Sequence, residues 1–225
     1  MSVFVDHLVV GAATLDQGVA WCEATLGVTP GPGGQHALMG THNRLLKIAT
    51  AGFVDAYLEV IAIDPDEPPP ARVRWFGLDG AALQSVLRRG PKLLHLVARS
   101  TMLDMHRWGL ITLGHAPGDP VAASRDTPAG RLSWQMLLRD DGRLLLAGAL
   151  PTLIQWQGPH PAHAMPGSGV RLSALTLQGV PERVRDLLRL RGAQVLATAG
   201  PALTATLDTP LGIVVLSSHF PQDAP

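Results

Sequence analysis

The order of predicted secondary-structure elements repeats along the chain, and this repeat constrains the fold more than any other feature. Residues 3–10 predict a strand. The segment TLDQGVAWCEATLG predicts a helix, because Thr14 and Gln17 form a capping-box pattern and apolar residues recur at helical spacing. Three strand candidates follow, near residues 35–39, at HNRLLKIA and at AYLEVIAI. Residues 1–64 therefore predict one βαβββ unit.

The same order recurs after a Pro-rich boundary. Residues 65–92 predict a linker, because the Pro-rich run DPDEPPPAR excludes regular structure, followed by a connector helix that ends at Gly90. Residues 93–157 again predict a strand, a helix and three strands, and residues 158–225 predict a loop and a shorter βαββ-like unit. We expect one compact α+β domain, in which repeated βαβββ units form an open, cup-shaped mixed barrel with a shorter third unit at the C-terminus.

Composition narrows the classes of partner. The 225 residues carry no formal net charge, and their 18 Lys and Arg residues are scattered, which argues against nucleic acid. The single cysteine, Cys22, excludes an internal disulfide and fits a reducing compartment. No signal peptide is apparent, and no apolar run is long enough to cross a membrane. We expect a cytoplasmic protein that binds a small-molecule ligand and neither nucleic acid nor membrane, with a homodimer left open.

Four polar residues interrupt the apolar first and last strands of the two long units. They are His7, Glu59, His95 and Gln155. An unpaired buried carboxylate is costly, so Glu59 in particular needs a partner. If the units are structural repeats, equivalent strands face a common centre, where two imidazoles, a carboxylate and an amide oxygen are suitable ligands for one divalent cation. We therefore predict a metal site formed by His7, Glu59, His95 and Gln155.

Several of these segments also resemble a known family. The run DHLVV, TLDQGVAWCEATLGV, GGQHALMGTHNRLLKI and YLEVIAIDP, with PTLIQW later in the chain, resembles the glyoxalase-like branch of the vicinal oxygen chelate superfamily over most of residues 3–178. The resemblance implies paired βαβββ units and, in the metalloenzymes of the family, a metal bound by inward-facing residues. It maps the first-strand ligands to His7 and His95 and the last-strand ligands to Glu59 and Gln155. Gln155 departs from the pattern, because a carboxylate is common at that place.

Other polar and aromatic residues are candidates for catalysis or substrate binding. Glu59 and His42 are the candidates for proton transfer, because a histidine near a carboxylate suits acid–base chemistry. The candidates for substrate binding are His36, Asn43, Arg125 and Trp156. The alternatives are structural. His7 or His95 alone also suits a hydrogen-bonded core position, and Gln155 also suits a structural hydrogen bond. His42 and Asn43 also suit a polar turn, and an arginine before a Pro/Gly turn is often a surface residue.

Three functions remain open at this stage. The first is a metal-dependent lyase or isomerase acting on a small carbonyl or enediol-type substrate, with Zn, Ni, Mn or Fe as the metal. The second is a non-haem iron dioxygenase, because two histidines and one carboxylate also form the facial triad of such enzymes. The third is a metal-free protein that binds or sequesters a small molecule.

Overall fold

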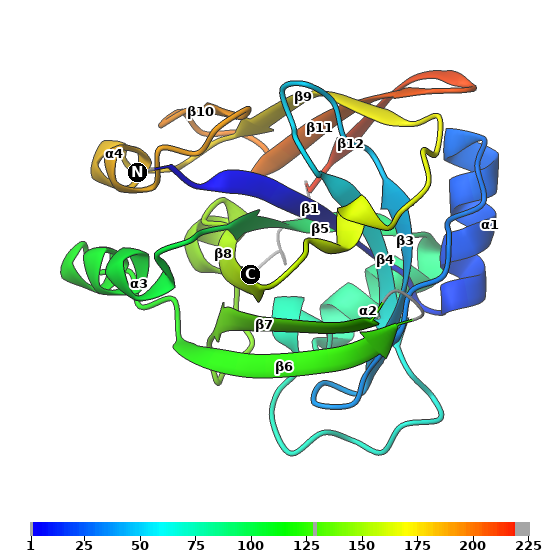
Figure 1. Cartoon of the computed structure of the whole chain (residues 1–225), viewed down its shortest axis with the longest axis horizontal. Helices are drawn as coiled ribbons and strands as arrows, with labels where there is room; N and C mark the ends of the chain where they lie inside the picture. Colours follow the sequence, from blue (N-terminus) through cyan, green and yellow to red (C-terminus); the bar gives the residue numbers. More distant parts are fainter. Residues whose placement is uncertain (1, 128–129, 219–225) are drawn as a thin grey trace.

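The computed structural model describes residues 2–127 and 130–218, and its main feature is a curved sheet of eight strands (Figure 1). The order of strands across this sheet is β2-β3-β4-β1-β5-β8-β7-β6. Their bounds are β1 Phe4–Gly11, β2 Gln35–His36, β3 Thr41–Lys47, β4 Tyr57–Ile63, β5 Lys92–Arg99, β6 Asp119–Thr127, β7 Gly130–Leu138 and β8 Thr152–Gln157. The predicted α+β fold of paired βαβββ units in a cup-shaped barrel is therefore confirmed.

The helices lie where the sequence predicts them. Their bounds are α1 Leu15–Leu26, α2 Ala81–Arg89, α3 Leu103–Thr112 and α4 Glu182–Leu188, and short 3₁₀ turns span Trp75–Gly77, Leu145–Gly148 and Pro161–His163. Thr14 caps α1, because its side chain accepts a hydrogen bond from the backbone N–H of Gln17. The Gln17 side chain accepts from Ala13, one residue before the position that a standard capping box uses. Within the described residues, no helix has the length and apolar character needed to cross a membrane.

An internal twofold relates the two long units. The first strands of the units, β1 and β5, are antiparallel neighbours at the centre of the sheet, and Leu8 lies opposite Leu96. Each of these strands also runs parallel to the last strand of its own unit, β4 or β8. A twofold axis at the Leu8–Leu96 pair therefore places His7 and His95 at equivalent positions, as the repeat predicts.

The third unit forms a separate sheet in the order β10-β9-β11-β12. Its strands are β9 Arg171–Leu177, β10 Gln194–Val195, β11 Leu203–Thr209 and β12 Gly212–Ser217. Figure 1 shows this sheet above the β1–β5 centre of the large sheet, with α1 and α3 at opposite sides of the molecule. Leu172 and Leu207 of the third unit belong to the same buried apolar cluster as Leu8 and Leu96 of the large sheet. The third unit therefore covers the outer face of the cup.

The inner face of the cup has its own apolar cluster. Val9, Ile61 and Val97 of the large sheet belong to it, together with Trp75 and Phe76 from the linker between the two long units. Both faces of the sheet are thus buried, the outer face by helices and the third unit, and the inner face by this cluster. Polar side chains on the inner face are the ones that can meet inside the cup.

Candidate functional site

A cavity on the inner face of the sheet contains His7 and Glu59. We call it the first cavity, and it encloses about 390 Å³ of space, its open mouth included. Its other lining residues are His36, Asn43, Tyr57, Trp75, Phe76, Arg125, Trp134, Met136, Ile154 and Trp156. Among the predicted catalytic and substrate-binding residues, His36, Asn43, Arg125 and Trp156 line this cavity, whereas His42 does not.

His7 and Glu59 face each other inside this cavity. His7 Nε2 lies 3.6 Å from Glu59 Oε2, and both side chains are buried. The register of the sheet explains the meeting, because His7 pairs with Tyr57 across β1 and β4, so that Glu59 lies two residues along on the same face. His7 is therefore a close neighbour of the buried Glu59 carboxylate, at a distance longer than a hydrogen bond.

Asp6 holds His7 from the other side, and sequence reasoning missed it. Its Oδ1 lies 2.7 Å from His7 Nδ1. Strict alternation would send the neighbours Asp6 and His7 to opposite faces, but the register of β1 against β5 shifts between Val5 and His7, which is a β-bulge. The only sequence signal was the pair of adjacent polar residues, DH, inside the apolar run FVDHLVV.

Asp6 is fully buried and accepts three hydrogen bonds. Besides His7, its donors are Trp156 Nε1 at 2.9 Å and His160 Nε2 at 3.0 Å, both to Oδ2. Burial alone would raise the pKa of Asp6, but the hydrogen bonds from His160 and His7 hold that pKa well below its usual range. Asp6 is therefore an anion that accepts the Nδ1 proton of His7, which leaves the lone pair of His7 Nε2 facing Glu59.

Asn43 positions Glu59 and connects it to Arg125. Its Nδ2 donates to Glu59 Oε1 at 2.5 Å, while its Oδ1 accepts from the backbone N–H of Gly34 at 2.8 Å. Arg125 NH1 lies 3.4 Å from the same Oδ1. The Asn43 amide therefore lies between the Glu59 carboxylate, on its nitrogen side, and the Arg125 guanidinium, on its oxygen side. This arrangement suits a ligand whose acidic group and reactive centre are close together.

Two further ring systems surround the pair of His7 and Glu59. The ring of Tyr57 stacks on that of His7 with 4.6 Å between centroids, and burial raises the pKa of Tyr57 well above its usual value. His36 Nε2 lies 4.0 Å from Glu59 Oε1. Burial lowers the pKa of His36 to about 4, although the Glu59 charge acts in the opposite direction. Near neutral pH, Tyr57 and His36 are therefore both uncharged.

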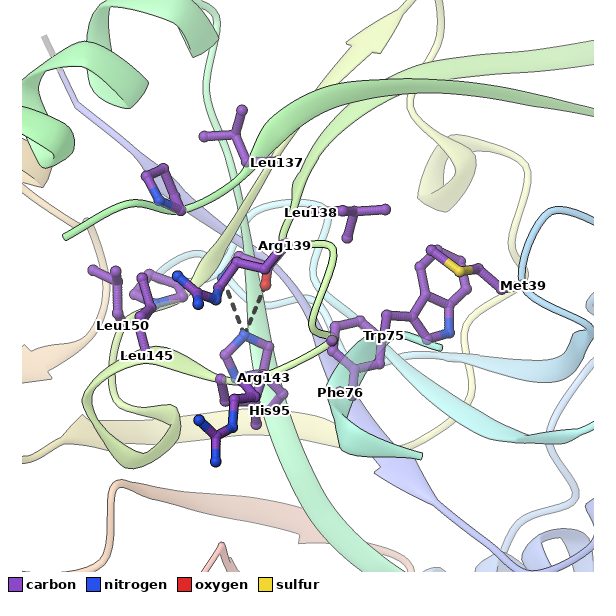
Figure 2. A pocket seen from close by; sticks show the side chains of 15 residues that line it. Met39, Trp75, Phe76, His95, Leu137, Leu138, Arg139, Arg143, Leu145 and Leu150 are labelled. Atoms are coloured by element: carbon purple, nitrogen blue, oxygen red, sulfur yellow. Dashed lines mark hydrogen bonds between the residues drawn. The ribbon is translucent and has the colours of Figure 1, made fainter. Parts of the chain in front are cut away.

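His95 lies on the same face of the sheet but lines a different cavity. This second cavity encloses about 470 Å³, its mouth included, and shares Trp75 and Phe76 with the first cavity. His95 Nε2 accepts from the backbone N–H of Thr152 at 3.1 Å and lies 3.0 Å from Thr152 Oγ1 (Figure 2). Burial lowers the pKa of His95 to about 3, so its ring is neutral.

The predictions for Gln155 and His42 are corrected by the direction of their side chains. Ile154 and Trp156 line the first cavity, so Gln155 between them faces the outside of the cup, where its Oε1 accepts from the backbone N–H of Leu103 at the start of α3. His42 likewise points away from the cavity that its neighbour Asn43 lines, and its Nδ1 lies 3.5 Å from Asp64 Oδ2.

The internal twofold identifies the residue that does stand opposite Glu59. Val9 pairs with Glu59 in the first unit, and its equivalent Val97 pairs with Thr152 in the second unit. Thr152 therefore takes the place of a second carboxylate. The predicted set of four ligands does not assemble, because Gln155 faces outward and His95 Nε2 is engaged by Thr152.

These positions do not fit a divalent metal ion or an iron facial triad. Metal binding requires free lone pairs from several side chains at one point. Glu59 accepts a hydrogen bond from Asn43, and His95 lines the second cavity rather than the first. Over residues 2–127 and 130–218, no three or more His, Cys, Asp or Glu side chains are arranged to hold a metal.

Comparison with known protein families gives one match. A family model described as a glyoxalase-like domain matches residues 5–190, which is most of the chain. No curated protein matches the sequence significantly. The match confirms the family that the motifs of the first two units indicate.

Comparison with solved structures gives further matches at low identity. A hypothetical protein from Staphylococcus aureus has a TM-score of 0.56 and 14% identity, covering 96% of this chain and 85% of that one. A methylmalonyl-CoA epimerase from Mycobacterium tuberculosis has a TM-score of 0.38 and 20% identity, covering 71% and 91%. A Streptomyces coelicolor methylmalonyl-CoA epimerase variant in complex with 2-nitronate-propionyl-CoA has values of 0.40 and 18%, covering 68% and 97%. The first of these supports the fold.

Proposed function

The chain belongs to the glyoxalase-like domain family, and from this premise we propose that its first cavity moves a proton on a small carbonyl compound without a metal ion. The reaction is of the lyase or isomerase type. One observation carries the proposal: His7 Nε2 lies 3.6 Å from Glu59 Oε2 in a buried cavity while Asp6 holds His7 Nδ1. A carboxylate that fixes one nitrogen of an imidazole makes the other nitrogen available as a base.

In the proposed step, His7 removes a proton from the carbon next to a substrate carbonyl. The proton goes to His7 Nε2, and the electron pair of the broken C–H bond moves to the carbonyl oxygen to form an enolate. The imidazolium of His7 then lies between the carboxylates of Asp6 and Glu59, which stabilise its charge. Delivery of the proton from His7 Nε2 to the enolate oxygen gives the enol, which completes an isomerisation, and its return to the carbon reverses the step.

Arg125 and the aromatic walls define the substrate. Arg125 has no carboxylate partner in the part of the chain that the structure describes, and it lines the cavity near Asn43 and Glu59. Its guanidinium suits a carboxylate on the substrate. Trp134 and Trp156, whose ring centroids lie 5.4 Å apart, supply an apolar wall for the rest of the molecule. The proposed substrate is therefore a carbonyl compound that also carries a carboxylate.

Exchange of substrate hydrogen with solvent tests this proposal directly. A panel of 2-oxo and 3-oxo acids is incubated in D₂O with protein that has been treated with EDTA, and loss of the C–H signal next to the carbonyl is followed by NMR. We expect exchange with at least one acid, unchanged by EDTA. His7→Asn should slow it about 10²- to 10⁴-fold, the usual contribution of a general base.

His42→Asn is the matched control, because this histidine lies on the outer face of the same sheet beside Asp64. Its exchange rate should equal that of the wild type. Exchange that appears only after Zn, Ni, Mn or Fe is added would contradict the metal-free proposal. Equal rates for His7→Asn and the wild type would exclude His7 as the base.

A second function, binding without chemistry, is favoured by the aromatic lining. Trp75, Phe76, Trp134 and Trp156 all line a cavity that holds one Arg and one Glu. A protein that sequesters a flat organic anion needs these features and no base. Binding of an acid from the same panel, measured by calorimetry, together with no exchange in any of them would favour this function over the isomerase.

A further inference from the structure

We propose that the second cavity is a separate binding site for a small apolar carboxylate. The cavity lies on the inner face of the large sheet, beside the first cavity, and Trp75 and Phe76 form the shared wall. Figure 2 shows Leu145 and Leu150 on one side of it and Phe76 and Trp75 on the other, with His95 between them in this view. The proposal does not depend on the function of the first cavity.

The internal twofold explains why this half of the cup suits binding rather than proton transfer. His95 is equivalent to His7, but Thr152 stands where Glu59 stands in the first half. Met136 pairs with Ile154 as Asn43 pairs with Ile61, so the residue that positions the Glu59 carboxylate is also replaced by an apolar side chain. The second half has therefore kept its imidazole and lost the acidic group and the amide.

The lining of the second cavity offers donors and no carboxylate. His95 Nε2 accepts from the backbone of Thr152, so the ring proton is on Nδ1. The backbone of Gly148 lies near this ring and favours its protonated form, but no acceptor among the described residues forms a well-aligned hydrogen bond with the buried Nδ1. Trp75 Nε1, in the shared wall, is likewise buried without a partner in residues 2–127 and 130–218. Buried donors without acceptors are uncommon in proteins and are often satisfied by a bound group.

The cavity also has an available cation. Arg139 is already bound, because Asp141 accepts from its Nε at 2.8 Å and Ala116 O accepts from its NH1 at 2.9 Å. Arg143 lines the same cavity, and its charge interacts with that of Asp141, although no carboxylate oxygen of the described residues lies within ion-pair distance of its guanidinium. A guanidinium beside unpartnered N–H donors favours an anion with acceptor oxygens, such as a carboxylate.

The remaining walls of the second cavity determine the non-acidic part of the ligand. Leu137, Leu138, Leu145 and Leu150 line the cavity, so the body of the ligand is apolar. A short-chain carboxylate such as hexanoate combines an anionic head for the donors with an apolar body for the leucine walls.

Binding of hexanoate to the full-length chain tests the proposal. Calorimetry measures hexanoate, hexanol and hexylamine, and NMR of ¹⁵N-labelled histidine rings locates the ligand. We expect hexanoate to bind at least tenfold more tightly than hexanol and hexylamine not to bind, and the His95 ring signal to shift while the His7 signal does not. Arg143→Gln should weaken hexanoate binding about tenfold, because it removes the charge and keeps a polar side chain of moderate length.

Two substitutions of Leu145 fill or enlarge the second cavity, and a third substitution removes the Glu59 carboxylate of the first cavity. Leu145→Trp should abolish binding of hexanoate, whereas Leu145→Ala should retain it and accept octanoate more readily. Glu59→Gln should bind hexanoate like the wild type, because Glu59 lines only the first cavity. Hexanoate binding can therefore fail or succeed independently of proton transfer in the first cavity. Equal binding of hexanol and hexanoate, unchanged binding in Leu145→Trp, or a shift of His7 in place of His95 would each overturn the proposal.

Discussion

Asp6 Oδ1 lies 2.7 Å from His7 Nδ1, and the same carboxylate also accepts hydrogen bonds from Trp156 and His160. The three donors come from β1, from β8 and from the start of the turn at Pro161–His163, so a single side chain connects the two long units and the loop that follows them. Any group that replaces Asp6 must accept three hydrogen bonds in a site without access to solvent.

Asp6→Asn should therefore destabilise the protein and disturb His7. The amide has one acceptor oxygen, and its nitrogen faces a donor, so at least one buried donor loses its partner at a cost of about 1–3 kcal/mol. Urea unfolding should show this loss, while Asp186→Asn, an exposed change on α4, should stay within about 0.5 kcal/mol of the wild type.

The tautomer of His7 distinguishes positioning from simple loss of stability. In the wild type, ¹⁵N NMR should show His7 protonated at Nδ1 near neutral pH, because the Asp6 carboxylate accepts that proton. In Asp6→Asn a mixture of tautomers is expected, and hydrogen exchange on a carbonyl substrate should slow at least tenfold even below the temperature at which the variant unfolds. An unchanged tautomer in the variant would show that Asp6 has only a structural role.

A second prediction concerns the residue equivalent to Glu59. Thr152→Glu should tighten zinc binding, because it places a carboxylate beside His95 Nε2 at the position that the twofold relates to Glu59. Gln155→Glu should leave zinc binding as in the wild type, since this side chain lies on the outer face near α3. Calorimetric titration at fixed pH measures both, because protons compete for the histidine. Tighter binding in Gln155→Glu alone would contradict the assigned faces.

The sequence predicted the fold and one half of the site because local patterns carry that information. Alternation along AYLEVIAI and the repeat of βαβββ units were sufficient to bring His7 and Glu59 to one cavity. Alternation along TLIQWQ separates Ile154 and Trp156 from Gln155, but it does not say which of these faces points inward, because both faces of this sheet are buried. Gln155 was therefore predicted to face inward, whereas it faces outward. His42 was predicted for the site together with Asn43, whereas only Asn43 lines the cavity.

The remaining features depend on contacts that no local pattern specifies. A bulge in β1 turns Asp6 toward the inner face. This bulge is defined by the pairing of β1 with β5, which are far apart in the sequence, so the sequence of β1 alone does not predict it. The separation of His95 from the first cavity depends on Trp75 and Phe76, which come from the linker after the Pro-rich segment. Phe76 has a φ of 57°, a left-handed backbone conformation that is uncommon for a bulky residue and that a sequence pattern would not predict.

Gly33 tests how closely the backbone must approach Asn43. A Cβ at this position would lie 2.1 Å from Asn43 O, which is backbone and cannot move aside cheaply. Gly33→Ala should reduce the free energy of unfolding by about 1–3 kcal/mol, the usual cost of overpacking, and should displace the amide that holds Glu59. Gly52→Ala is the control, because a Cβ added at Gly52 has Thr50 Oγ1 as its nearest neighbour, 4.0 Å away. Equal stability of the two variants would show that the Gly33 segment relaxes freely.

The last prediction is that stability falls with pH below about 6.5, because His36 and His95 are buried without charge. Their pKa values in the folded protein are lowered to about 4 and about 3, whereas the unfolded chain binds protons near pH 6.5. Between these limits the unfolded state binds more protons than the folded state, so stability is lost as pH falls. Each histidine contributes a slope of up to about 1.4 kcal/mol per pH unit.

Urea unfolding at pH 7.5, 6.5, 5.5 and 4.5 measures this slope. His95→Gln should be less stable than the wild type at pH 7.5, because Gln cannot fill the ring volume, yet its stability should fall less steeply toward pH 4.5, since one of the buried imidazoles with a lowered pKa is gone. His36→Gln should reduce the slope in the same way. If the curves of both variants run parallel to that of the wild type over this range, neither histidine is the group whose protonation in the unfolded chain opposes folding.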